Sequence, residues 1–386
     1  MTGAAASVSY RERYFPDVPD REWNDWRWQM RNRVVTLAGL ERFLPLSDVE
    51  RAELPAVLRE FRVGITPYYL SLIDPEDPAD PVRLQAVPSA AEFHNANVGE
   101  RDPLAEERFS PVPGLTHRYP DRCLMVVTNS CALYCRYCTR KRIMGADDAP
   151  AAREALDRMI DYVARTPAIR DVVVSGGDPL TWSTARIDEV LGRLRAIPHV
   201  EIVRLGSRVP VVMPQRITAE LCEALERHGP LWLNVHFNHP REVTAEAGDA
   251  CERLLRAGVP LNNQTVLLRG VNDDLATMKA LVHALLRIKV RPYYLYHCDP
   301  VTGAHHFRTT VAKGLEIIEG LRGHTSGLAV PTYVIDAPDG GGKVPLQPDY
   351  LLSYRGGRAR LRNFQGRRFR YDDPVHAPRH RTVRSA

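Results

Sequence analysis

The sequence predicts an α/β protein organised around an open (β/α)6 barrel, about three-quarters of a TIM-like barrel, with a helical region before it and an extension after it. Two observations predict the barrel. From about residue 122, short β-branched runs alternate with amphipathic stretches of helical length. Clusters of polar residues follow the ends of these runs, where parallel barrels carry their chemistry. We expect three regions, at 1–108, 109–330 and 331–386.

The helical region comes first. Its segment 20–40 combines charged residues with three tryptophans, and aromatic residues at this spacing favour core packing over a cofactor site. Ser47 followed by Glu50 predicts a capping box at the start of a further helix. Prolines then interrupt the helical pattern, so we expect an irregular connector to the barrel. These prolines are Pro67, Pro75, Pro78 and Pro81.

The barrel follows the connector. Repeated strand–helix units imply a parallel sheet with right-handed crossovers, and six repeats are too few to close an eight-stranded barrel. The predicted strands lie at 123–128, 171–175, 201–206, 231–237, 261–267 and 291–296. The predicted helices lie at 151–165, 184–197, 218–228, 244–257 and 275–288.

Composition excludes several classes of protein. The chain is 44% hydrophobic and 26% charged, which is typical of a globular protein, and no apolar run is long enough to span a membrane. Residues 1–4 do not resemble a secretion signal, and seven cysteines in 386 residues do not suggest a disulfide framework. We therefore expect a cytoplasmic protein. Much of the net charge of +5 lies in the tail beyond residue 355, which lacks a repeating aromatic pattern, so no nucleic-acid partner is expected.

Three cysteines directly follow the first predicted strand. Cys131, Cys135 and Cys138 can offer three thiolates to one metal centre, and the fourth protein ligand is missing. Iron–sulfur clusters usually take four cysteines, so this spacing predicts a cluster with one open iron. A zinc site that lacks a ligand and three unrelated buried cysteines are the alternatives.

Two glycine-containing motifs mark other parts of the pocket. The second strand ends in Ser175, Gly176, Gly177 and Asp178, where glycines allow close approach of the backbone and the acid can accept from an ammonium group; a simple turn is the alternative. Far downstream, a glycine run delivers Lys343, which could form a Schiff base with an aldehyde such as pyridoxal phosphate (PLP). A phosphate-binding loop fits poorly because no Ser or Thr follows this lysine.

Together these motifs make the chain resemble the lysine 2,3-aminomutase family, whose members are radical S-adenosylmethionine (radical SAM) enzymes that also use PLP. The resemblance extends from about residue 10 to residue 369. It is carried by the stretches 114–122, 131–142, 206–208, 306–309, 320–327 and 335–343.

The resemblance implies cofactors and residue roles. It implies a 4Fe–4S cluster on Cys131, Cys135 and Cys138, SAM beside Asp178, and PLP attached to Lys343. The implied cofactor-binding residues are Arg118, Tyr119 and Arg122 near the PLP phosphate, Gln264 and Tyr296 near PLP and substrate, and Ser175, Gly176, Gly177, Asp178, Ser207 and His236. A histidine on a buried strand can equally be a core residue. An external one-electron reductant is also implied.

The resemblance also implies a substrate. Arg140 matches the position that binds the substrate α-carboxylate, and Asp299 and Asp336 match the carboxylates that hold a distal ammonium group. A buried cation must be paired, so two acids select a basic amino acid and disfavour glutamate. We expect L-lysine to become β-lysine, with L-arginine as the alternative. A lysine aminomutase linked to a translation factor and a non-catalytic iron–sulfur protein are less favoured.

Some positions depart from the family pattern. The cysteines that hold structural zinc in the best-known members are missing at residues 272–274 and after Cys298, so no structural zinc is expected. Asp339 and Gln347 stand where relatives often have Gly and Met. The family implies a homodimer or tetramer.

Overall fold

The computed structural model describes residues 9–94, 98–144 and 151–374. The start at residues 1–4 and the last basic residues of the tail, from 375 onward, lie outside the described residues. No helix in the described part is long and apolar enough to cross a membrane.

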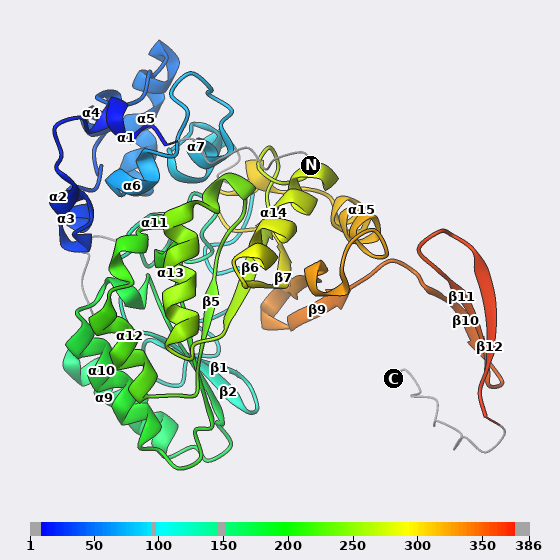
Figure 1. The fold of residues 1–386 in the computed structure, drawn as a ribbon. Coiled ribbons are helices and arrows are strands. Elements are labelled where there is room, and N and C mark those ends of the chain that lie inside the picture. Colours follow the sequence, from blue (N-terminus) through cyan, green and yellow to red (C-terminus); the bar gives the residue numbers. More distant parts are fainter. Residues whose placement is uncertain (1–8, 95–97, 145–150, 375–386) are drawn as a thin grey trace.

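A barrel sheet forms the body of the described chain (Figure 1). Its nine strands follow one another in chain order, and among the described residues no pairing joins the two edges, so the barrel is open. Neighbours from β2 to β8 pair in parallel, whereas β1 and β9 are antiparallel edge strands. The strands are β1 (Leu115–Tyr119), β2 (Arg122–Val126), β3 (Asp171–Ser175), β4 (Ile202–Gly206), β5 (Leu231–Val235), β6 (Leu261–Leu267), β7 (Arg291–His297), β8 (Thr332–Ala337) and β9 (Gly342–Leu346).

Helices on the outside of the sheet connect the parallel strands (Figure 1). Most begin at a Ser, Thr or Asp whose side chain accepts a hydrogen bond from a backbone N–H of the first turn. The helices are α9 (Arg153–Ala164), α10 (Thr184–Arg195), α12 (Ala219–Arg227), α13 (Ala245–Arg256), α14 (Leu275–Arg287) and α15 (Val311–Leu321). Short 3-10 turns lie in the loops of the barrel at η1 (Pro179–Thr181), η2 (Pro214–Arg216), η3 (Pro240–Glu242), η4 (His305–Phe307), η5 (Gly327–Ala329) and η6 (Pro338–Gly340).

The predicted open barrel of parallel strands is confirmed, and the described sheet has one parallel strand more than the six expected. The additional strand is β8, which lies after residue 330 and pairs with β7. The helix before it, α15, was not predicted because two glycines weaken its helical pattern. Gly314 is required there: a Cβ at this position would lie 2.2 Å from the ring of Tyr333 on β8.

The N-terminal region is helical, as predicted, and covers one end of the barrel (Figure 1). The capping box is confirmed, because Ser47 and Glu50 exchange side-chain and backbone hydrogen bonds at the start of α5. The proline prediction is partly wrong: Pro67 and Pro81 each occupy the first turn of a helix, where the missing N–H costs nothing. The helices are α1 (Arg11–Tyr14), α2 (Asp20–Trp23), α3 (Trp26–Arg31), α4 (Leu37–Glu41), α5 (Asp48–Glu60), α6 (Pro67–Leu70), α7 (Pro81–Ala86) and α8 (Ala91–His94).

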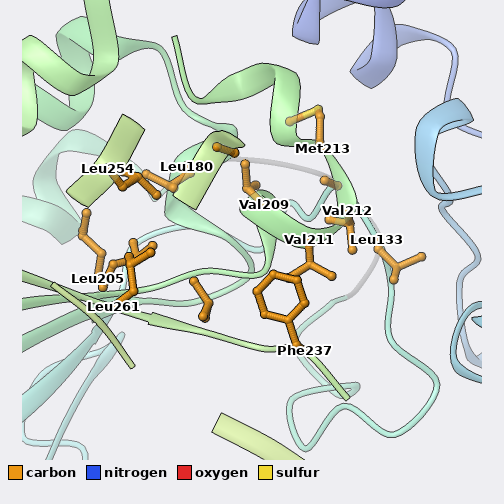
Figure 2. Close-up of a cluster of buried hydrophobic side chains, with 14 of the residues drawn as sticks. Leu133, Leu180, Leu205, Val209, Val211, Val212, Met213, Phe237, Leu254 and Leu261 are labelled. Carbon is orange, nitrogen blue, oxygen red and sulfur yellow. The ribbon is translucent and has the colours of Figure 1, made fainter. Parts of the chain in front are cut away.

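The hydrophobic core continues from the barrel into the layer beneath the cysteine loop (Figure 2). The short helix α11 (Val209–Val212), just after β4, buries all four of its residues. Around it lie Phe237 beyond β5 and Leu133 from the cysteine loop, both buried. The loop therefore rests on a packed apolar surface.

A small sheet beyond residue 350 was not predicted. It is an antiparallel meander of β10 (Leu351–Arg355), β11 (Arg358–Arg362) and β12 (Arg368–Asp372), and it projects away from the barrel (Figure 1). The signal was weak because arginines alternate with aromatic residues that remain exposed, Tyr371 at 60% and Tyr354 at 51%.

Candidate functional site

One cavity brings the predicted site residues together. It has a volume of about 700 Å³ and lies at the carboxyl ends of the parallel strands. Its walls include the cysteine loop at one place and Asp299, Asp336 and Lys343 at another. Every residue that the sequence analysis assigned to cofactors or substrate lines this cavity. This size suits a cofactor together with a small substrate.

The cysteine loop is held in place by the N-terminal region. Tyr134 N–H donates to the carbonyl of Gly64 (3.1 Å), and Arg136 N–H donates to the carbonyl of Gln85 (3.0 Å). The Arg136 side chain, only 2% exposed, forms a bidentate ion pair with Glu92 of α8. The predicted helical region thus positions the loop from behind.

The three thiols face a shared, partly charged environment. Nη1 of Arg208 lies 2.8 Å from Sγ of Cys135, which places a permanent positive charge beside one thiolate. Burial, with a contribution from Cys135, raises the pKa of Cys138, and its Sγ accepts from the backbone N–H of Arg140 at 3.4 Å. A cation and an N–H donor suit the anionic sulfurs of a cluster.

No three His, Cys, Asp or Glu side chains converge on a single metal ion within the described residues. In a four-iron cluster each cysteine binds a different iron, so its sulfurs need not converge on one point. The arrangement of the three thiols is one that such a cluster can use. The expected lack of structural zinc stays a prediction.

The two glycines after β3 allow that loop to lie against the cysteine loop. A Cβ at Gly176 would lie 2.4 Å from the carbonyl oxygen of Thr128, and a Cβ at Gly177 would lie 2.3 Å from that of Ser130. Instead, Gly177 N–H donates to Thr128 (2.6 Å) and Asp178 N–H to Ser130 (2.8 Å). The glycine motif predicted close approach to a ligand, and in the structure both glycines lie against the cysteine loop.

Asp178 is buried and already accepts several hydrogen bonds. The donors are the hydroxyl of Ser207 (2.7 Å) and the backbone N–H groups of Leu180, Arg208 and Val209. Burial, partly offset by these donors, raises the pKa of Asp178 to about 6. Its carboxylate fixes the chain after β4, so direct acceptance from a SAM ammonium group stays a prediction.

Lys343 and Asp336 face each other across the last two strands of the barrel sheet, β9 and β8. They are register partners of the antiparallel pair β8–β9, and Nζ of Lys343 lies 3.2 and 3.3 Å from the two carboxylate oxygens of Asp336. The backbone N–H of Lys343 donates to the hydroxyl of Tyr119 at 2.9 Å. Nζ also lies 5.2 Å from the centre of the Tyr296 ring. The amine is therefore held in the cavity.

The neighbouring arginines suit a phosphate group. Nε of Arg118 is buried and has no hydrogen-bond partner among the described residues, which leaves a donor available to an anion. Nη1 of Arg118 lies 3.9 Å from Asp336. Arg122 stacks over Tyr119 at 4.0 Å and pairs with Asp121 at 3.0 Å. Guanidinium groups bind phosphate well, so this side of the cavity fits the phosphate of PLP.

Polar residues at the ends of the middle strands also line the cavity. Burial, with a contribution from Arg208, lowers the pKa of His236 to about 4, so its imidazole is neutral at pH 7. Gln264 donates from Nε2 to the hydroxyl of Tyr296 at 3.1 Å. Ser175 lies at the end of β3 and also lines the cavity.

Asp299 lies near Asp336 in the same wall. Burial, reinforced by the charge of Asp336, raises the pKa of Asp299 to about 7, although Lys343 and Arg308 act in the opposite direction. When two carboxylates lie close together, the pKa of one of them rises unless a cation binds between them. This end of the cavity therefore favours a positively charged group.

Sequence reasoning missed the glutamates that hold the loop arginines. Arg140 lines the cavity, and its guanidinium forms an ion pair at 2.7 Å with Glu106, which lies in the connector between the N-terminal helices and the barrel (residues 98–114). Glu92 plays the same part for Arg136. No short-range spacing reveals such pairs, because the partners are separated by dozens of residues in the chain.

The fold and the cysteine loop together define a radical SAM enzyme. Residues 125–281 match the family described as the Radical SAM superfamily, and residues 318–384 match the one described as Lysine-2,3-aminomutase. The chain is 54% identical to "L-lysine 2,3-aminomutase" of Fusobacterium nucleatum subsp. nucleatum, covering 95% of this chain and 87% of the relative. It belongs to the lysine 2,3-aminomutase family, whose cofactors are a 4Fe–4S cluster, SAM and PLP.

Two further relatives bear on the substrate. "L-lysine 2,3-aminomutase" of Clostridium subterminale is 54% identical, with 95% of this chain and 88% of the relative covered. "Glutamate 2,3-aminomutase" of Clostridioides difficile is 45% identical, with 92% and 84% covered. High similarity thus extends to relatives with different substrates, and the residues of the cavity must distinguish between them.

Proposed function

We propose that this protein is a radical SAM, PLP-dependent aminomutase that converts L-lysine to β-lysine. The single observation that carries the proposal is the cavity, which has a cysteine loop and Arg140 in one wall and Lys343 with two aspartates in another. The relatives named "L-lysine 2,3-aminomutase" support it. When bound, the cluster and SAM supply a carbon radical that removes a hydrogen atom, and PLP carries the migrating amino group.

The residues of the chain bind the cofactors, orient the substrate and shield the reacting atoms from water. Lys343 provides the amine that attaches PLP, and the hydroxyl of Tyr119 holds the backbone at this lysine. Arg118 and Arg122 suit the phosphate, while Gln264 and Tyr296 line the adjoining wall. A carbon radical reacts with any nearby C–H bond, so exclusion of water and fixed orientation are the main contributions of the protein.

The charge of the cavity supports lysine as the substrate. Asp336 is 4% exposed in its side chain and is paired with Lys343 Nζ in this structure. Asp299 lies near this pair, so the two carboxylates carry more negative charge than Lys343 alone neutralises and can accept a substrate ammonium group. Arg140 provides the opposite charge for the α-carboxylate. A glutamate side chain would meet two like charges at the acidic end.

Three further features are part of this proposal. Reduction of the cluster needs an external one-electron donor. The protein forms a homo-oligomer, and it works in the cytoplasm, where a reducing environment preserves the cluster.

Spectroscopy tests the cofactor assignment. Anaerobically reconstituted protein should show the broad absorption of an iron–sulfur cluster together with the band of lysine-bound PLP. Lys343→Ala should lose only the PLP band, while Lys313→Ala, which changes a partly exposed lysine on α15, should keep both. A PLP band that survives in Lys343→Ala would overturn the assignment.

An anaerobic assay tests the substrate. With SAM, PLP and a reductant, L-lysine should yield β-lysine, and arginine and glutamate should react much more slowly. Preferential turnover of arginine would move the assignment to an arginine aminomutase. Inactivity on all three amino acids would contradict the proposed function.

A further inference from the structure

The connector before the barrel places Glu106 directly against Arg140. Nε of Arg140 donates to both carboxylate oxygens of Glu106, at 3.1 and 3.2 Å, and Nη2 donates to Oε1 at 2.7 Å. The two side chains are only 15% and 9% exposed. Glu106 therefore binds the side edge of the guanidinium.

The opposite end of the same guanidinium is left for a ligand. Nη1 of Arg140 makes no hydrogen bond to any residue that the structure describes, and Arg140 lines the cavity. A guanidinium is planar, so fixing its Nε–Nη2 edge also fixes the direction of Nη1. We propose that Glu106 is a positioning residue, which orients Arg140 so that its free end binds the substrate α-carboxylate. This inference rests on the proposed function, in which Arg140 receives that carboxylate.

Glu106 is itself held by the loop on the other side. Arg142 contacts it at 3.4 Å and also pairs with Asp102 of the connector at 3.2 Å. The carbonyl of Leu104 accepts from the side chain of Arg118, so the connector is anchored next to the phosphate-binding arginine as well. Burial raises the pKa of Glu106, but Arg140 and Arg142 outweigh it, and the pKa lies below its usual value. The glutamate thus remains charged and fixed at neutral pH.

A competing role would have Glu106 occupy the place of the substrate carboxylate until substrate displaces it. The geometry favours orientation over competition, because displacement would leave a nearly buried carboxylate with only its longer contact to Arg142. The two roles also predict opposite effects of removing the charge, since loss of a competitor tightens substrate binding and loss of a positioning group weakens it.

The test measures binding without turnover. In anaerobic holoenzyme lacking SAM, addition of L-lysine should shift the PLP absorption band, and the shift gives an apparent Kd. We expect Glu106→Gln to raise this Kd by about tenfold or more, whereas Kd for 1,5-diaminopentane, which is lysine without its carboxylate, changes by less than about twofold. In an Arg140→Gln background, Glu106→Gln should have little further effect on lysine.

Controls separate positioning from folding. Glu107→Gln, on the same connector but with a side chain that is 77% exposed and paired with Arg142, should bind both ligands like the wild type. Glu106→Asp keeps the charge and should restore part of the affinity for lysine. Equal weakening of both ligands, or tighter lysine binding, in Glu106→Gln would overturn the inference. A wild-type protein whose PLP band does not respond to lysine would instead contradict the proposed function.

Discussion

Arg136 and Arg140 lie in the same cysteine loop and make the same kind of ion pair, yet they serve different ends. Each presents Nε and Nη2 to a glutamate from the preceding region, Glu92 or Glu106. Nη1 of Arg136 then donates to the carbonyl of Arg62 at 2.6 Å, which uses the remaining edge of that guanidinium. The corresponding nitrogen of Arg140 has no partner among the described residues. A fully used arginine fixes the backbone, whereas a partly used one remains able to bind a ligand.

The largest effect is expected at the ion pair of Arg136 and Glu92, in which the guanidinium has no nitrogen left for a ligand. Glu92→Leu leaves the buried cations of Arg136 and Lys141 without their carboxylate, so the free energy of unfolding should fall by about 3–5 kcal/mol. Urea denaturation of the apoprotein measures this. Glu189→Leu, which breaks an exposed pair with Arg153, should cost less than about 1 kcal/mol. Similar losses in the two variants would show that burial does not distinguish the pairs.

Changes to the ion pair of Arg140 and Glu106 should affect substrate binding more than the stability of the fold. Arg140→Lys keeps the charge but cannot reproduce the forked geometry, so the apparent Kd for L-lysine should rise by about tenfold, which corresponds to about 1.4 kcal/mol. Chemical denaturation should show a smaller loss than in Glu92→Leu. A variant that binds lysine normally would remove the proposed difference between the two arginines.

The acidic end of the cavity should respond to pH, unlike the arginine end. The pKa of Asp299 is raised to about 7 by burial and by Asp336, so the free site is partly protonated below this pH. Binding a cation requires the carboxylate, and lysine affinity should therefore increase as pH rises through about 7 and fall by up to about tenfold per unit below it. Titrations from pH 6 to pH 8 measure this, and Asp299→Asn should flatten the profile. A wild-type profile without slope would contradict it.

The smallest effect is expected for the single hydrogen bond between Tyr119 and the backbone of Lys343 on β9. Tyr119→Phe removes the hydroxyl that accepts from Lys343 N–H, and should lower the free energy of unfolding by about 1 kcal/mol. Tyr371→Phe on the exposed meander offers a control, where almost no change is expected because this side chain is 60% exposed. If the free energy of unfolding falls equally in the two variants, the hydrogen bond at Lys343 does not stabilise the fold more than an exposed hydroxyl does.

Much of the fold and of the site could be predicted from the sequence, but the buried ion pairs and the meander could not. Strands such as β3 and β6 were predicted at their observed bounds, because a buried parallel strand is a continuous apolar or β-branched run. The site residues meet in one cavity because parallel strands end on the same side. Glu92 and Glu106 could not be found in this way, since a buried ion pair leaves no periodic pattern. The meander was missed because its exposed aromatic residues do not alternate with a buried face.

The contacts of Gly176 and Gly177 have a consequence for how the cluster is acquired. Backbone hydrogen bonds from the loop after β3 define the path of the chain at Thr128 and Ser130 by protein contacts alone. Iron and sulfide would therefore enter a preformed receptacle and would not have to fold it.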